Sequence, residues 1–305
     1  MKNKYKSLTA LVLSMLIFGT VGIFSKHIPL QPGAIAFVRA TVGMLFLITV
    51  MAILRKKPNF ASIRKNLPYL MISGICLGAN WILFFAACRY TTVPTATLSY
   101  YLAPAILIIA AFFVFREKIT VKKALAILVA LFGMVLAAGV IEGGAEGVSY
   151  IGILFGLAAA VLYATVVIFN KLMSDIDAFD KTVVQFGVCG AVLLPYVLIF
   201  EGVNDIKVDF KTVIFALLVG IIHTGAAYAL YFGVTSKLSS DTIAIYSYID
   251  PVVSILVSTV FFKEPITLLG ALGAVLIIGA SLISEIDVKN VKSRKTDEEK
   301  QDENR

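Results

Sequence analysis

The sequence contains few charged residues and few of the residues on which soluble enzymes rely. Charged residues make up 15% of its 305 positions, and there are two histidines, three cysteines and one tryptophan. A soluble domain has about 25% charged residues. The sequence has no phosphate-binding loop, nucleophile elbow, zinc-protease helix or dinucleotide-binding glycine motif, so we expect neither ATP nor any other cofactor. The cysteines lie in apolar stretches without metal-ligand spacing, which indicates packing and no metal site.

Long apolar runs take up most of the chain instead. Hydrophobic residues form 59% of the sequence, and the mean hydropathy is +0.91. A helix needs about 20 apolar residues to cross the hydrocarbon of a bilayer. The sequence therefore predicts an all-α integral membrane protein with ten transmembrane helices, the third of which follows Pro68. The ten runs are 7–25, 31–54, 66–88, 90–115, 124–141, 147–170, 182–200, 212–236, 242–262 and 265–284.

Positive charge is concentrated in short connecting segments. The chain has 27 Lys and Arg against 19 Asp and Glu, a net charge of +8. The basic residues are spread over loops and both ends, so the charge does not indicate nucleic acid binding. Alternate loops hold most of them, as in the segments 55–57, 64–65 and 122–123. By the positive-inside rule, this predicts a multi-pass protein of the plasma or inner membrane with both termini in the cytoplasm.

One stretch of the sequence occurs twice. Tyr101-Leu102-Ala103-Pro104 recurs 147 positions later as Tyr248-Ile249-Asp250-Pro251, and the segment 20–26 recurs 145 positions later as 165–171. Each half holds five predicted helices, an odd number, so the second half is expected to enter the membrane from the opposite side as an inverted repeat. The expected units are a first repeat over 1–141, a connector over 142–148, a second repeat over 149–286 and a disordered cytoplasmic tail over 287–305.

Three ionisable residues inside apolar runs are candidate functional residues. Asp250 lies in the middle of a run, where inserting a carboxylate costs roughly 2.5–3.5 kcal/mol. It can couple transport to protons, or it can stay neutral and brace the kink at Pro251. His223 lies at a similar depth and can bind substrate and relay protons with Asp250, or it can make a structural hydrogen bond. Arg39 lies nearer the outer end of its run, where it can snorkel or bind a carboxylate or phosphate at the mouth of a cavity.

Aromatic and amide side chains at membrane depth are predicted to line a substrate-binding pocket. Aromatic faces with a few polar groups are typical of sites for small organic molecules. The alternative is an interfacial aromatic belt, but these residues lie inside their runs. The candidates are Asn80, Trp81, Tyr100, Tyr101, Tyr228, Tyr246 and Tyr248.

Two pairs of opposite charges lie at the ends of apolar runs. Lys26 and Glu264 are expected on the outer side of the membrane, and Lys171 and Glu117 on the inner side, with the repeat relating one pair to the other. They are candidate outer and inner gates. The alternative is that they cap helix ends in water, where an ion pair contributes at most about 1 kcal/mol.

The two five-helix halves, each with a proline-containing helix, an acidic loop residue and a last helix rich in Gly and Ala, resemble the EamA-type transporters of the drug/metabolite transporter superfamily. The stretches 101–117 and 248–264 carry the resemblance, which extends over about residues 8–285. It implies a central cavity between helices 1–4 and 6–9, with the fifth and tenth helices as a scaffold. Members of this family move amino acids, metabolites and small toxic compounds, commonly outward, as gradient-driven or facilitative carriers.

The sequence therefore predicts a secondary transporter, not an enzyme, that exports a small metabolite, amino acid or drug-like compound by alternating access, with protons as the candidate coupling ion. Its expected partners are a small-molecule substrate and the lipid bilayer, with no nucleic acid, and it is expected to be a monomer or homodimer. Two alternatives stay open. An oligomeric channel would need rings of polar groups around a pore, and a membrane-embedded enzyme would need clustered His, Asp or Glu near one interface.

Overall fold

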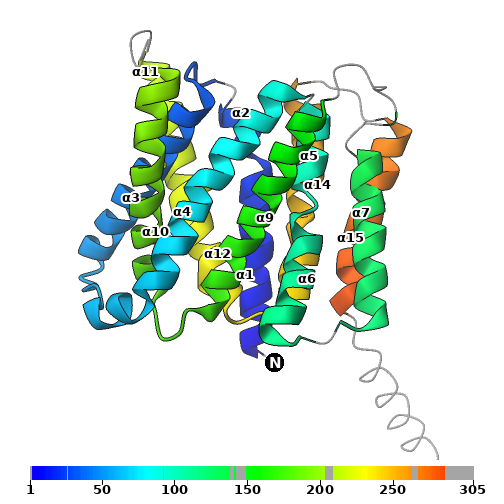
Figure 1. Ribbon diagram of the computed structural model, residues 1–305, viewed down its shortest axis with the longest axis horizontal. Coiled ribbons are helices and arrows are strands. Elements are labelled where there is room, and N and C mark those ends of the chain that lie inside the picture. The colour runs from blue at the N-terminus through cyan, green and yellow to red at the C-terminus, as the bar shows by residue number, and fades with distance from the viewer. Residues whose placement is uncertain are drawn as a thin grey trace, which may run out of the picture.

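The computed structural model describes residues 2–25, 27–91, 93–117, 119–137, 141, 149–202, 209–262 and 267–285, and the secondary structure of these residues is helical throughout. The helices stand side by side in one bundle (Figure 1). α1 begins at the lower end of the bundle in this view, whereas α9 begins at the upper end. The elements are α1 Lys2–Gly19, α2 Val21–Ser25, α3 Pro32–Ile53, α4 Phe60–Tyr90, α5 Val93–Tyr100, α6 Ala103–Phe115, α7 Val121–Ala137, α9 Tyr150–Leu172, α10 Ala178–Tyr196, η1 Val197–Glu201, α11 Phe210–Leu218, η2 Val219–Ala226, α12 Ala227–Thr235, α13 Ser240–Ser247, α14 Ile249–Phe262 and α15 Leu268–Glu285.

Within the described residues, eight helical segments are long and apolar enough to cross a membrane. The all-α membrane-embedded class is thereby confirmed. The predicted fifth and tenth helices are present as α7, with 17 residues, and α15, whose apolar part is Leu268–Ala280. That all ten cross the bilayer stays a prediction. The eight segments are Tyr5–Phe24, Pro32–Ile53, Phe60–Tyr90, Thr95–Phe115, Tyr150–Leu172, Ala178–Glu201, Phe210–Thr235 and Ser240–Phe261.

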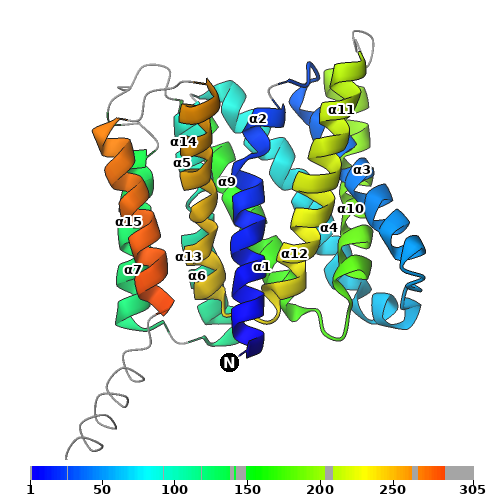
Figure 2. The ribbon, with the colours of Figure 1, turned by 180° about the vertical axis from the view of Figure 1, so that it is seen from behind.

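α7 and α15 pack against each other at one side of the bundle (Figure 2). Their backbones approach closely, because a Cβ atom built on Gly133 would lie 2.8 Å from the carbonyl oxygen of Gly273. Small residues permit this kind of helix contact in a membrane. The predicted connector 142–148, the predicted tail and the candidate outer gate residues Lys26 and Glu264 lie outside the described residues.

The third long helix differs from the prediction, because α4 begins at Phe60 and contains Pro68 in its interior. Asn59 is its N-cap, and the side-chain oxygen of Asn59 accepts a hydrogen bond from the amide of Ser62 at 3.0 Å. A proline removes one hydrogen bond of a helix, but this capped first part extends the helix before Pro68. The apolar run alone does not contain the polar residues that start the helix.

Three of the membrane segments are interrupted. The first breaks at Thr20, between α1 and α2, and the two others break at the repeated motif, where α5 gives way to α6 and α13 to α14. Pro104 and Pro251 follow these two breaks, where a proline cannot donate a backbone hydrogen bond. The breaks contact each other, since the hydroxyl of Tyr248 donates to the carbonyl oxygen of Tyr101 at 3.1 Å. The two halves of the chain thus meet at their equivalent irregular points.

Candidate functional site

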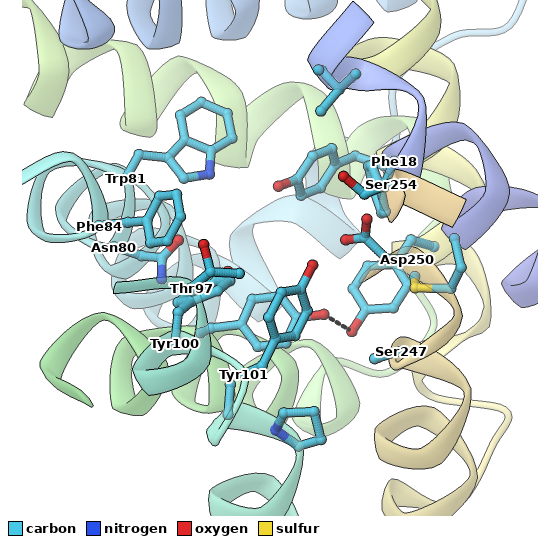
Figure 3. Close-up of a pocket in the computed structure, with 18 of the residues that line it drawn as sticks. Phe18, Asn80, Trp81, Phe84, Thr97, Tyr100, Tyr101, Ser247, Asp250 and Ser254 are labelled. Atoms are coloured by element: carbon cyan, nitrogen blue, oxygen red, sulfur yellow. Dashed lines mark hydrogen bonds between the residues drawn. The ribbon is translucent and has the colours of Figure 1, made fainter. Parts of the chain in front are cut away.

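A cavity of about 450 Å³ lies inside the bundle, between the interrupted helices of the two halves. Figure 3 shows side chains from both halves pointing into it. Its volume is in the range of pockets for small organic molecules. The lining residues are Met15, Phe18, Val21, Gly22, Arg39, Asn80, Trp81, Phe84, Phe85, Thr97, Tyr100, Tyr101, Ala103, Pro104, Tyr163, Tyr228, Tyr231, Ser247, Asp250 and Ser254.

Aromatic rings form most of the wall around Tyr228. Its ring centroid lies 4.8 Å from that of Phe18 and 6.1 Å from that of Trp81, both in edge-to-face geometry. Tyr163 and Tyr231 stack with centroids 6.5 Å apart, and their hydroxyl oxygens are 2.7 Å apart. Because each ring is held by a neighbour, the wall is rigid and offers flat apolar faces to a ligand.

Arg39 brings a positive charge to this aromatic wall. Its Nε atom donates to the hydroxyl of Thr224 at 3.1 Å, and its Cζ atom lies 5.1 Å from the centroid of the Trp81 ring. This contact is a cation–π interaction, which attracts a guanidinium to the face of an indole. These contacts favour the cavity interpretation of Arg39 over the snorkelling alternative. The side chain is held toward the cavity, because a hydroxyl and an indole face are available inside the bundle.

Asp250 brings a carboxyl group to the cavity. It lies in the first turn of α14, where the partial positive charge of the helix N-terminus favours a carboxylate. The Tyr101 side chain interacts with the Asp250 carboxyl, and Figure 3 places both groups at the cavity. Among the described residues, no salt bridge joins Arg39 to Asp250. The cavity therefore presents a guanidinium and a separate carboxyl group.

The other predicted pocket residues divide into two groups. Asn80, Trp81, Tyr100, Tyr101 and Tyr228 line the cavity. The amide nitrogen of Asn80 also donates to the carbonyl oxygen of Ala159 at 2.7 Å, which ties α4 to α9.

Of the described residues, His223, Tyr246 and Tyr248 are predicted pocket residues that the cavity lining does not include. Tyr248 is fully buried and Tyr246 is buried in α13. The Nε2 atom of His223 lies 3.0 Å from the hydroxyl oxygen of Thr20. No hydrogen bond between His223 and Asp250 occurs within the described residues, so the geometry favours the structural interpretation of His223.

Several residues that line the cavity were not among the predicted pocket residues, for example Phe18, Tyr163 and Tyr231. The repeat contained a signal for them. Phe18 and Tyr163 are 145 positions apart, as are the repeated first-helix segments, and Tyr231 lies 147 positions after Phe84, which also lines the cavity. Both members of these pairs face the cavity. Thr97, Ser247 and Ser254, by contrast, are small hydroxyl residues of a kind that sequence patterns cannot separate from packing.

The predicted inner gate residues meet at the lower end of the bundle. The Nζ atom of Lys171 lies 3.2 Å from Oε1 of Glu117 and donates to the carbonyl oxygen of Leu238 at 2.6 Å. Glu117 accepts hydrogen bonds from the amide of Ser240 at 3.0 Å and from its hydroxyl at 3.2 Å. Glu117 thus caps the N-terminus of α13 as well as pairing with Lys171. These contacts agree both with a gate and with a helix cap, so they do not decide between the two interpretations.

A bundle of apolar helices around an aromatic cavity with a few ionisable groups is typical of membrane transport proteins. Comparison with known proteins agrees with this class. The sequence matches the EamA-like transporter family twice, over residues 6–139 and 150–285. The chain therefore belongs to the EamA-like transporter family.

Similar proteins carry transporter names. The chain is 28% identical to the uncharacterized transporter YxxF of Bacillus subtilis (strain 168), over 97% of this chain and 96% of that protein. It is 26% identical to an uncharacterized transporter of Archaeoglobus fulgidus, over 90% of this chain and 94% of that protein. A crystal structure with a TM-score of 0.81 and 18% identity, covering 92% of this chain and 96% of the other, has the same fold. The protein is thus a membrane transporter and not an enzyme, as predicted.

Proposed function

We propose that the protein is a secondary carrier that exports a small amphipathic compound bearing both an ammonium and a carboxylate, such as an amino acid, by alternating access. The observation that carries the proposal is the guanidinium of Arg39 and the separate carboxyl group of Asp250 on an otherwise aromatic and apolar cavity wall. A charge in a poorly hydrated cavity is costly unless it is paired. A ligand with both charges pairs each of them at once, while its apolar body packs on the rings.

Alternating access accounts for the repeated sequence and for the opposite directions of α1 and α9. Inverted repeats give two similar packings that open to opposite sides around one central site. We propose that both termini are cytoplasmic and that the membrane is the plasma or inner membrane, on the basis of the positive-inside bias. The lower end of the bundle is then the cytoplasmic end.

Asp250 is also the proposed coupling residue. When the substrate leaves the cavity, the Asp250 carboxylate loses the substrate ammonium as its partner. A proton can then neutralise the carboxylate in place of the ammonium. Substrate and proton would then move in opposite directions. This assigns coupling to Asp250 without His223, which bonds elsewhere.

Binding is tested with the fluorescence of Trp81, the single tryptophan of the chain. Purified protein is titrated with L-phenylalanine, with hydrocinnamate, which lacks the ammonium, and with phenethylamine, which lacks the carboxylate. We expect L-phenylalanine to bind at least about tenfold more tightly than either analogue, because each charge-assisted hydrogen bond contributes about 1.5–3 kcal/mol. Equal affinity for all three would contradict the role of the charges.

Transport is tested in proteoliposomes that contain a pH-sensitive dye. Protein with intact Asp250 is expected to accumulate L-phenylalanine when a pH gradient is imposed. The Asp250→Asn variant is expected to lose that accumulation while retaining exchange at substrate concentrations high enough to offset its weaker binding. If the variant accumulates substrate as well as the wild type, Asp250 is a helix brace, and the coupling proposal is wrong.

The Lys171–Glu117 pair is the proposed cytoplasmic gate. Glu117→Gln weakens both its ion pair and its cap on α13, so we expect a severalfold change in the rate of substrate exchange. The matched control is Lys65→Gln, which removes an exposed ion pair with Asp175 at 2.9 Å. An equal effect of the two variants on exchange would exclude a gate at Glu117.

A further inference from the structure

The segment η2 is a π-helix in the middle of the membrane span Phe210–Thr235. Such turns are rare and are frequent at functional sites. η2 packs closely on α3, because a Cβ atom built on Gly220 would collide with the side chain of Val42, and one on Gly225 would lie 2.7 Å from Cδ1 of Phe46. The irregular turn is therefore held against the helix that carries Arg39.

Thr224 of η2 orients the cavity's positive charge. Its hydroxyl donates to the carbonyl oxygen of Val219 at 3.0 Å, which leaves the hydroxyl oxygen free to accept from Nε of Arg39 at 3.1 Å. Both residues of this side-chain bond lie in η2. With Nε occupied, the guanidinium keeps its place over the Trp81 ring.

The adjacent residue, His223, contacts Thr20 at the break between α1 and α2. The Thr20 hydroxyl oxygen lies 2.8 Å from the carbonyl oxygen of Ile17 and 3.0 Å from Nε2 of His223, so this hydroxyl joins the break to the His223 ring. The His223 ring also packs on Phe24 of α2, with centroids 4.8 Å apart. The two residues after Thr20 line the cavity.

We infer that η2 is a positioning element that sets the Arg39 guanidinium and the α1–α2 break together, with Thr224 and His223 as its two positioning residues. The contacts form one continuous path, from Thr20 through His223 and Thr224 to Arg39. If η2 returned to an α-helical register, the side chains beyond the turn would rotate by roughly 100°. Both contacts would then be lost in the same step. The inference rests on the proposed function only in that Arg39 receives the substrate.

The test uses two reporters in ligand-free protein in nanodiscs. The first is the emission of Trp81, calibrated with Arg39→Gln. The second is a cysteine at position 22, Gly22→Cys, in a background in which the three native cysteines are replaced by alanine. Gly22 lines the cavity, and a Cβ atom built on it meets no atom within 4 Å. Its rate of labelling by a maleimide reports the position of α2.

Thr20→Val removes the hydroxyl that His223 contacts, and Thr20→Ser keeps it. We expect the valine variant to change the labelling rate at position 22 by about threefold and to shift the emission of Trp81 as well. The serine variant is expected to change neither. Thr224→Val and Thr224→Ser form the same comparison from the Arg39 side, and the valine variant is expected to move both reporters.

His223→Leu breaks the Thr20 contact from its other end and provides a second variant should Thr20→Val fail to fold. It is expected to reproduce the Thr20→Val effects, and the double variant to add nothing, since both remove one contact. A change in labelling with unchanged Trp81 emission would overturn the inference and make the His223 contact local packing. Because no ligand is present, failure of L-phenylalanine to bind leaves this result unaffected.

Discussion

Tyr101-Leu102-Ala103-Pro104 in the first half and Tyr248-Ile249-Asp250-Pro251 in the second interrupt their membrane segments at equivalent positions. Ala103 and Asp250 both line the cavity, but one has a methyl group and the other a carboxylate. Both motifs have a tyrosine and a proline at the helix break, and they differ in the residue that lines the cavity. Two motifs with the same helix break therefore place different side chains at the cavity, so the chemistry of the site depends on single positions.

Asp250→Ala makes the two motifs alike at the position that faces the cavity, and it is expected to have the largest effect. The affinity for L-phenylalanine should fall by roughly tenfold or more, because the ammonium loses its charged acceptor. The affinity for hydrocinnamate should not fall, since that compound has no ammonium. Titration of Trp81 fluorescence measures both. Ala103→Ser at the equivalent position is the control, and a similar loss in that variant would contradict a specific role for Asp250.

The two tyrosines of the motif provide a sharper comparison. Tyr248→Phe removes the donor to the Tyr101 carbonyl, and we expect a loss of about 1 kcal/mol of stability. Tyr101→Phe leaves that bond intact, because the acceptor is a backbone oxygen. Because Tyr101→Phe also removes the contact of the Tyr101 side chain with Asp250, the comparison is with the wild type, and the thermal midpoint of Tyr248→Phe in detergent should lie about 2 °C below it. Equal midpoints would show that the contact between the breaks adds no stability.

The smallest expected effect concerns the helix caps outside the membrane. α4 is capped by the neutral Asn59, whereas α11 is capped by Asp209, which accepts a hydrogen bond from the amide of Thr212 at 2.7 Å. Hydrogen bonds from the Thr212 hydroxyl and amide lower the pKa of Asp209 below its ordinary value. Its contribution is therefore present above the unfolded pKa and is lost as the pH falls through the folded pKa.

Asp209→Asn keeps a cap that does not titrate. Between about pH 5 and about pH 3, the thermal midpoint of the wild type should fall slightly more than that of the variant. Asp209→Ala, without a cap, should be less stable than both at neutral pH. Parallel acid profiles for the wild type and Asp209→Asn would contradict an acid-sensitive cap at α11.

Particular residues show how far the sequence leads toward the site. Depth in an apolar run identified Asp250, Trp81 and Tyr228 as candidates, because polar and amphipathic side chains at membrane depth need a cavity or a partner. The same criterion selected Tyr246 and Tyr248, which are buried in protein contacts. Depth along a helix is readable from sequence, but the direction in which a side chain points depends on neighbouring helices.

The sequence by itself determined the all-helical, membrane-embedded class, the two related halves and the family, since length, hydropathy and the repeat act along the chain. Tertiary structure alone decided which groups meet. Packing places the Arg39 guanidinium over the face of the Trp81 ring, and it brings His223 into contact with Thr20, 203 positions away in the sequence. It also placed a π-helix where the sequence predicts an uninterrupted helix. These outcomes depend on packing between segments that are distant in the sequence, and local sequence patterns do not predict that packing.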